Sequence, residues 1–196
     1  MISEFLLDNS GFISIVLGLF FNFNFLEILF FFINFEPMKV KIGLGYDVHR
    51  FADQRDLILA GVKIPYTQGL LGHSDADVVL HAVCDALLGA AGLPDIGFHF
   101  PPSDPSYKDI DSKILLKKVF TLIQEKKYQV NNLDITVLLE KPKIAPYVLE
   151  MRKNIAAILE IPLEDVNIKA TTTEKLGYEG RGEGATAMAV VLLIQQ

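Results

Sequence analysis

The composition of the chain changes abruptly at Met38, and this change limits which residues can build a compact fold. Ten of the 14 phenylalanines lie before residue 36, and residues 1–37 contain no lysine, arginine or histidine. Residues 11–35 are almost entirely apolar and exceed the roughly 20 residues that a membrane-spanning helix needs. However, Glu27 interrupts this stretch, and no basic residue precedes it to set an orientation. We therefore expect the folded domain to comprise residues 38–196.

Residues 1–37 allow three interpretations. We favour a translation start at Met38, with the preceding residues read from upstream AT-rich DNA, because Phe, Ile and Asn dominate them. A hydrophobic organelle-targeting leader and a membrane anchor are the alternatives. The positive start of a signal peptide and the Arg- and Ser-rich composition of a transit peptide are both missing from this stretch.

Strand and helix patterns alternate along residues 38–196. β-Rich and alternating runs predict strands at 39–49, 57–59, 62–64, 130–139, 166–171 and 185–194. Apolar residues at helical spacing predict helices at 74–91, 111–127 and 147–160. Ser74 is expected to cap the first helix, with Asp77 at the third helical position completing a capping box. These patterns predict one domain of the α/β (α+β) class, with a single sheet packed by helices on one side.

Charge and cysteine content exclude several classes of protein. Residues 38–196 hold 18 basic and 20 acidic residues, so no basic bias indicates a nucleic-acid partner. The single cysteine, Cys84, excludes a disulfide framework and a Cys-x-x-Cys zinc site within the chain. Cys84 lies within an apolar helical pattern, so we expect it to be buried and inert.

An aspartate and two histidines form the first candidate site. Asp47 and His49 lie at the end of a predicted strand, where side chains at i and i+2 share a face. His81 lies in the middle of the predicted helix at 74–91. Imidazole and carboxylate are common zinc ligands, and three protein ligands leave a fourth position for substrate. The alternatives are a structural histidine, a simple helix-capping role for Asp77 and an ordinary solvated or hydrogen-bonded role for Asp85. We expect Asp77 and Asp85 to support the site or to contact substrate and not to bind the metal.

A Thr-rich and Gly-rich segment forms the second candidate site. Lys-Ala-Thr-Thr-Thr-Glu-Lys-Leu-Gly occupies 169–177, at the end of a predicted strand, and Gly-Arg-Gly-Glu-Gly occupies 180–184. Hydroxyls, lysine and flexible backbone suit phosphate binding, and Glu174 suits a hard divalent ion. A plain turn is the alternative. No Walker A loop, dinucleotide fingerprint or Gly-x-Ser-x-Gly elbow is present, so ATP hydrolysis and NAD binding are poorly supported.

Taken together, these segments resemble the cyclodiphosphate synthase family of the non-mevalonate isoprenoid pathway. The resemblance is carried by Gly-Tyr-Asp-Val-His-Arg at 45–50, Gly-Leu-Leu-Gly-His-Ser-Asp-Ala-Asp at 69–77 and Leu-His-Ala at 80–82. It continues through Ile-Pro-Tyr at 64–66, Asp-Ala-Leu-Leu-Gly-Ala at 85–90, Asp-Ile-Gly at 95–97, Phe-Pro at 100–101 and the two C-terminal segments. It is collinear over essentially all of 38–196 and includes no part of 1–37.

The resemblance implies a homotrimeric lyase with active sites between adjacent subunits. It implies Zn²⁺ held by Asp47, His49 and His81, and a second divalent ion, Mg²⁺ or Mn²⁺, held with the help of Glu174. It implies catalytic roles for His73, Thr172 and Glu174. Substrate contacts are implied for Asp47, His49, His73, Ser74, Asp95, Ile96, Gly97, Phe100, Asp104, Leu139, Lys143, Ile144, Ala145, Thr171, Thr172, Thr173, Glu174, Tyr178 and Arg181. Pro102 stands where many family members carry aspartate, which puts one carboxylate contact to the sugar in doubt.

The chemistry implied by the resemblance is an intramolecular phosphoryl transfer on a nucleotide-diphosphate substrate, which expels CMP without a protein nucleophile. A zinc-dependent phosphate-ester hydrolase and a non-catalytic metal- or nucleotide-binding module are the alternatives. We expect no membrane partner for residues 38–196. The expected location is the cytoplasm for a bacterial source, or the stroma of a plastid-type organelle if residues 1–37 are a leader.

Overall fold

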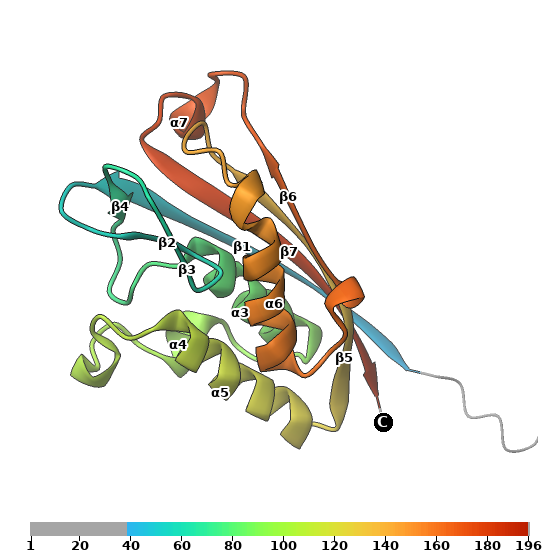
Figure 1. Ribbon diagram of the computed structural model, residues 1–196. Coiled ribbons are helices and arrows are strands. Elements are labelled where there is room, and N and C mark those ends of the chain that lie inside the picture. The colour runs from blue at the N-terminus through green and yellow to red at the C-terminus, as the bar shows by residue number, and fades with distance from the viewer. Residues whose placement is uncertain (1–38, 196) are drawn as a thin grey trace, which may run out of the picture. The chain divides into compact units, whose positions relative to one another are not determined.

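The computed structural model describes residues 39–195, and the interpretations of residues 1–37 lie outside this range. A five-stranded sheet with the order β4-β1-β7-β5-β6 forms the centre of the fold (Figure 1). Its strands are β1 (Val40–Ala52), β4 (Gly69–Leu70), β5 (Tyr128–Leu138), β6 (Val166–Thr171) and β7 (Gly184–Gln195). The β5–β6 pair is parallel and the other pairs are antiparallel. Strands β2 (Leu57–Leu59) and β3 (Val62–Ile64) form a separate hairpin, as the sequence predicted.

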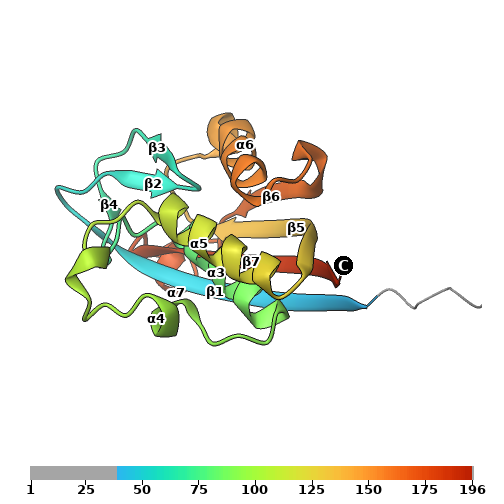
Figure 2. The same cartoon turned by 90° about the horizontal axis from the view of Figure 1, so that it is seen from below.

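Three long helices cover one face of the sheet, which confirms the predicted fold class (Figures 1 and 2). They are α3 (Val78–Ala90), α5 (Ser112–Glu125) and α6 (Val148–Leu159). The shorter elements are α4 (Ile96–His99), α7 (Gly177–Gly180), η1 (Pro105–Tyr107), η2 (Ala145–Tyr147) and η3 (Leu163–Asp165). Alternate residues of β1, β5 and β7 point into the core against the helices, together with the fully buried Cys84.

Helix α3 lies unusually close to strand β1 because two glycines leave room for it. A Cβ atom on Gly43 would lie 1.9 Å from the carbonyl oxygen of Ala86, and one on Gly45 would lie 1.8 Å from that of Ala82. The helix presents alanines at these contacts, so backbone packs against backbone. This close approach fixes where the side chains of α3 stand relative to those of β1.

On the opposite face of the sheet, the part formed by β1 and β7 is apolar and exposed. Along β1, every second residue from Val40 to Val48 is exposed, and Leu44 reaches 62%. The exposed Met188 and Val190 of β7 stand beside Tyr46 and Leu44, so the apolar surface continues across both strands. A surface of this kind marks an interaction site more often than a solvated face.

The structure corrects the predicted start of the first helix. Helix α3 begins at Val78, and the side chain of Asp77 accepts hydrogen bonds from the backbone N–H groups of Val79 and Leu80. The capping box expected at Ser74 is therefore wrong. Ala76 has a left-handed backbone conformation, with φ at 59°, which keeps residues 74–76 out of the helix.

The fully buried Asp77 also accepts hydrogen bonds from the backbone N–H groups of Ala60 and Gly61, so it ties the β2–β3 turn to the helix. Among residues 39–195, no helix is both long enough and apolar enough to cross a membrane.

Candidate metal and substrate site

The first candidate site begins in the second half of β1, which continues to Ala52, three residues beyond the predicted strand end at His49. Asp47 and His49 occupy alternate positions on this strand, and both side chains point to the face that the helices cover. Here the helix layer is open, so Asp47 and His49 are only partly buried. The strand geometry alone therefore brings a carboxylate and an imidazole to one side of the sheet, as expected.

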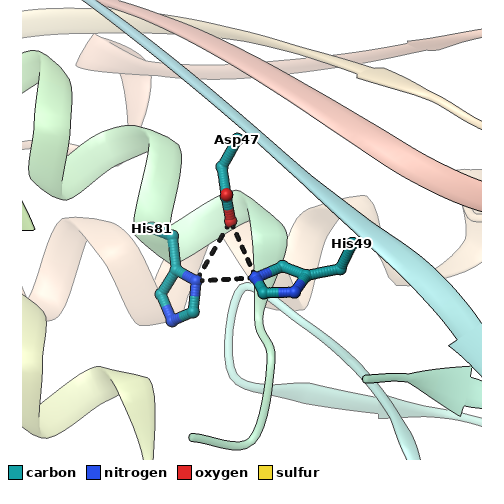
Figure 3. Close-up of side chains that lie close together, drawn as sticks. All are labelled: Asp47, His49 and His81. Carbon is teal, nitrogen blue, oxygen red and sulfur yellow. Dashed lines mark hydrogen bonds and ion pairs between the residues drawn. The ribbon is translucent and has the colours of Figure 1, made fainter. Parts of the chain in front are cut away.

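His81 completes the group from helix α3, which lies across β1 (Figure 3). Its Nδ1 atom lies 3.0 Å from Asp47 Oδ2 and 3.1 Å from His49 Nε2. His49 Nε2 also lies 3.0 Å from Asp47 Oδ2, so three potential ligand atoms face a common point. The sequence-based expectation that these three residues converge is confirmed.

The donor set fits a transition-metal ion such as zinc. One carboxylate oxygen and two imidazole nitrogens are ligands that zinc accepts at about 2.0–2.2 Å. His49 Nδ1 donates a hydrogen bond to the carbonyl oxygen of Leu71 at 2.8 Å, which leaves Nε2 free to offer its lone pair. A second hydrogen bond of this kind is typical of metal-binding histidines.

Without a metal, the same geometry forms a charged pair. Burial by itself would raise the pKa of Asp47, but the hydrogen bonds from His49 and His81 outweigh it and hold the pKa well below its ordinary value. Burial would lower the pKa of His49, but the hydrogen bond and negative charge of Asp47 raise it above its ordinary value. The site therefore attracts positive charge.

A cleft of about 150 Å³ opens beside the three residues. It is lined by residues from β1, α3, α4, η1, α5 and the loops between them: His49, His73, Ser74, His81, Ile96, Gly97, Phe100, Pro102, Tyr107, Ile110 and Leu115. Seven of the residues to which the resemblance assigned substrate or metal roles therefore surround one hollow: His49, His73, Ser74, His81, Ile96, Gly97 and Phe100.

Asp85 and Asp95 do not line this cleft but bind the backbone of α4, whose residues Ile96 and Gly97 do. Asp85 Oδ1 accepts a hydrogen bond from the backbone N–H of Ile96 at 2.8 Å, and Asp95 caps α4 through the N–H of Phe98. Asp85 thus fixes the start of α4 beside the cleft, and its expected supporting role towards the metal ligands remains a prediction. Asp104 caps η1 through the N–H of Ser106 and does not line the cleft.

The second candidate site lies at the ends of β5 and β6. Leu139 donates its backbone N–H to the carbonyl of Thr171, and a cis peptide bond joins Lys141 to Pro142 just beyond. Residues Lys143, Ile144 and Ala145 follow. The Thr172 hydroxyl donates to Glu174 Oε1 at 3.1 Å, while Thr173 and Lys175 both donate backbone N–H groups to Glu140. Glu140 therefore orders this loop, a role that the resemblance did not indicate.

The two candidate sites stand at the same end of the sheet but on different strands. Val48 of β1 and Leu138 of β5 both pair with Thr186 of β7, and Leu138 pairs with Thr171 of β6. Three strand-to-strand steps separate β1 from β6, which amounts to about 14 Å. Within one chain, the structure therefore does not bring Thr171–Glu174 to the cleft.

Tyr178 and Arg181 lie apart from the cleft. The Tyr178 hydroxyl bonds to the hydroxyls of Tyr46 and Thr186, and Tyr46 belongs to the exposed face of β1. Burial, together with the hydrogen bonds with Tyr46 and the Glu179 carboxylate, raises the pKa of Tyr178 to about 12. Arg181 forms a bidentate ion pair with Glu183.

Sequence reasoning missed several residues of the cleft. Tyr107, Ile110 and Leu115 line it, and Ser112 hydrogen-bonds His81 from behind. The only sequence signal for Ser112 was its place at the start of a predicted helix, which indicates a cap and not a contact with His81.

Comparisons with known proteins agree on one group of relatives. The model of the YgbB family matches residues 40–194. A 2-C-methyl-D-erythritol 2,4-cyclodiphosphate synthase from Geobacillus sp. (strain WCH70) is 58% identical over 153 residues, which cover 78% of this chain and 97% of the relative. The bifunctional IspDF from Campylobacter jejuni superposes with a TM-score of 0.79 at 42% identity, over 82% of this chain and 43% of that chain. A CDP complex of IspF from Plasmodium falciparum gives a TM-score of 0.71 at 36% identity, over 80% of this chain and 97% of that chain.

Proposed function

Because the chain belongs to the YgbB family, we propose that it is the lyase of the non-mevalonate isoprenoid pathway that forms 2-C-methyl-D-erythritol 2,4-cyclodiphosphate. Its substrate is then 4-diphosphocytidyl-2-C-methyl-D-erythritol 2-phosphate, and CMP is the second product. The observation that carries this proposal is the meeting of Asp47, His49 and His81 at a cleft that His73 and Ser74 also line.

The reaction makes and breaks one type of bond. An oxygen of the 2-phosphate attacks the β-phosphorus of the diphosphate, and the bond from this phosphorus to the bridging oxygen breaks, so that CMP leaves with the electron pair. The attacking phosphate is already ionised at neutral pH, so no protein nucleophile is needed. The task of the protein is to hold two anions together, and such positioning supplies about 7–11 kcal/mol of barrier reduction.

The proposed metal ions would help to hold these two anions together. Asp47, His49 and His81 would hold Zn²⁺, and Glu174 would help to hold Mg²⁺ or Mn²⁺. When bound, the zinc would polarise a phosphate oxygen and the second ion would offset charge on the leaving CMP.

The remaining residues of the cleft orient the substrate. His73 is exposed at the rim of the cleft, so it is placed to contact a phosphate held at the three ligands. Ser74 would also contact the substrate because it lines the cleft, although its buried hydroxyl lies beside His81 Nε2 and not beside the ligand atom Nδ1. Asp95 and Gly97 would contact the erythritol portion, since α4 forms the adjoining wall. Pro102 lines the cleft but has no carboxylate, so we assign no carboxylate contact to the sugar at this position.

A homotrimer would complete the active site. Leu139, Lys143–Ala145 and Thr171–Thr173 would bind the cytidine and its phosphates, with Thr172 and Glu174 beside the transferred group. Since these residues lie about 14 Å from β1 within one chain, we propose that an adjacent subunit supplies them to each cleft. The exposed apolar face of β1 and β7 supports such an assembly, because a second and third copy would bury it. Tyr178 and Arg181 would then lie near the axis of the trimer.

Product analysis tests the proposed reaction. Purified protein loaded with zinc and magnesium is expected to release CMP and cyclodiphosphate in equal amounts from the nucleotide substrate. His81→Ala should lose zinc and most of this activity while it keeps its fold. Release of inorganic phosphate would indicate a hydrolase, and stoichiometric binding without turnover would indicate a binding module. We also propose a cytoplasmic location for a bacterial source, or the plastid stroma if residues 1–37 are a leader.

A further inference from the structure

A chain of buried polar groups stands behind His81, on the side away from the proposed metal. Ser112 Oγ lies 3.0 Å from His81 Nε2, whereas Nδ1 of the same ring faces Asp47. Ser112 donates its hydroxyl hydrogen to Asp75 Oδ1 at 2.5 Å and its backbone N–H to Asp75 Oδ2 at 3.0 Å. Ser112 has no exposed surface, so water does not reach its hydroxyl, while Asp75 is partly buried.

The directions of these hydrogen bonds determine where the proton of His81 must be. A serine hydroxyl has one hydrogen, and Ser112 gives it to Asp75. Towards His81, Ser112 can therefore only accept, and Nε2 must carry the hydrogen that is donated. With its proton on Nε2, a neutral His81 presents the lone pair of Nδ1 to Asp47 and His49, where the proposed ion would lie.

We propose that Asp75 and Ser112 are positioning residues of the metal site, which together hold the His81 ring in the orientation and tautomer that bind the ion through Nδ1. This inference rests on the metal site proposed above. It assigns to His81 an indirect carboxylate partner, with a serine hydroxyl between the two, whereas His49 uses the backbone carbonyl of Leu71 for the same purpose. Both arrangements are forms of the outer-shell support that metal-binding histidines commonly have.

Nearby backbone hydrogen bonds connect Asp75 to the wall of the cleft. Asp75 donates its backbone N–H to Ile110, and Asp109 donates its own to His73, so the segment before α3 is fastened to the segment before α5. Ser74 Oγ also lies near His81 Nε2, at 3.1 Å. It is a weaker hydrogen-bond partner for this nitrogen than Ser112, because it also accepts from the N–H of Ala76 and does not donate to a carboxylate.

Asp75→Asn tests the direction of the hydrogen bonds as well as their presence. Backbone N–H groups point at both carboxylate oxygens: that of Ser112 at Oδ2, at 3.0 Å, and that of Asp77 at Oδ1, at 3.2 Å. An asparagine that keeps its single oxygen on the shorter contact, with Ser112, turns its NH₂ towards Ser112 Oγ. The Ser112 hydroxyl would then be free to donate to His81 Nε2, which favours the tautomer with the proton on Nδ1. That tautomer cannot bind the ion through Nδ1.

The experiment measures zinc affinity of the full chain by competition with a chromophoric chelator, after the metal has been stripped. We expect Ser112→Ala and Asp75→Asn each to weaken zinc binding about 10–100-fold. Thr121→Ala removes a hydroxyl from the surface of the same helix, and Asp53→Asn changes an exposed aspartate, so both controls should bind zinc like the wild type. In the zinc-loaded wild type, ¹⁵N NMR should show a hydrogen on His81 Nε2 that exchanges slowly with water, and Ser112→Ala should speed this exchange.

The results separate the inference from the metal site on which it rests. Zinc affinity within twofold of the wild type in both variants would overturn the positioning role while leaving the metal site in place. Unchanged zinc binding by His81→Ala would overturn the metal site itself, and the positioning role with it. Far-UV circular dichroism of the stripped variants shows whether the fold is retained, and Asp75→Asn, which keeps the size of the side chain, serves if Ser112→Ala fails to fold.

Discussion

At the scale of single residues, Asp47 and His49 act on the stability of the metal-free protein in a pH-dependent way. The pKa of Asp47 is lowered, so its contribution is present above the unfolded value of 3.8 and is lost as the pH falls through the folded value. The pKa of His49 is raised, so its contribution is complete below 6.5 and is lost as the pH rises through the folded value. The pair therefore stabilises the metal-free protein most between pH 3.8 and 6.5, the two unfolded values.

Asp47→Asn tests this behaviour. In stripped protein at pH 5, we expect the substitution to lower the free energy of unfolding by on the order of 1–3 kcal/mol, because it removes one partner of a partly buried ion pair. The loss should shrink at higher pH, because the positive charge of His49 is lost as the pH rises through its raised pKa. Urea denaturation at pH 5, 7 and 9 and one protein concentration measures the difference, and a loss that stays constant with pH would contradict the assignment.

The sequence predicted the ligand residues better than their support. Asp47 and His49 could be paired because neighbouring positions of a strand have a known geometry, and His81 stood out as a polar residue in an apolar helix. The contact of Ser112 with Asp75 joins residues 37 positions apart, and it depends on how two loops fold against each other. No local pattern encodes such a contact.

At the scale of elements, the close contact between α3 and β1 sets the distance from His81 to the two ligands on the strand. Gly45→Ala would place a Cβ atom 1.8 Å from the carbonyl oxygen of Ala82 and 2.7 Å from the N–H nitrogen of Ala86. Both atoms belong to the helix backbone and cannot turn aside. We expect the helix to move and the free energy of unfolding to fall by more than about 2 kcal/mol, with weaker zinc binding.

Gly89→Ala is the matched control for this prediction. Gly89 lies on α3 itself, and an added Cβ would have no atom within 4 Å. Alanine favours helix more than glycine does, so the free energy of unfolding of this variant should rise by up to about 1 kcal/mol. Thermal or urea denaturation of both variants decides the matter, and equal effects of the two substitutions would show that the contact is unimportant.

The elements themselves were largely predictable, and their ends were not. Periodicity placed all three long helices and the main strands, because each has one apolar face. The start of α3 was wrong by about one turn, since Ser74 and Asp77 both have capping side chains. The left-handed conformation of Ala76 decided between them, and an alanine gives no sequence signal for that conformation.

At the scale of the whole molecule, the exposed apolar face predicts assembly. Leu44→Lys would place three ammonium groups in the centre of a trimer without partners, so we expect monomers or weakened association. Ile114→Lys changes an apolar residue of similar exposure, 48% against 62%, on the outer surface of helix α5 and should leave the assembly intact. Sedimentation or light scattering at several concentrations distinguishes the two, and a stable trimer of Leu44→Lys would contradict the assignment of this face.

A shared active site makes a further prediction for mixtures. His81→Ala and Glu174→Ala should each be inactive as pure homotrimers, because they damage different parts of the same site. If neighbouring subunits supply these parts, random mixing by co-expression restores intact sites at about one quarter of all positions. Assays of CMP release measure the recovery. Its complete absence, with mixed trimers proven by mass spectrometry, would place both residues in one subunit's own site.

The position of β7 in the sheet has a consequence for how the chain folds while it is synthesised. This strand lies between β1 and β5 and pairs with both, yet it is the last strand of the sheet to be synthesised. While the ribosome is still translating it, β1 has no partner along most of its length, and Asp47 and His49 have no sheet to hold them. Pairing across such a long stretch of sequence is slow and leaves apolar edges open. Metal capture and subunit assembly therefore follow the synthesis of β7, and chaperones have an interval before it in which to shield the nascent chain.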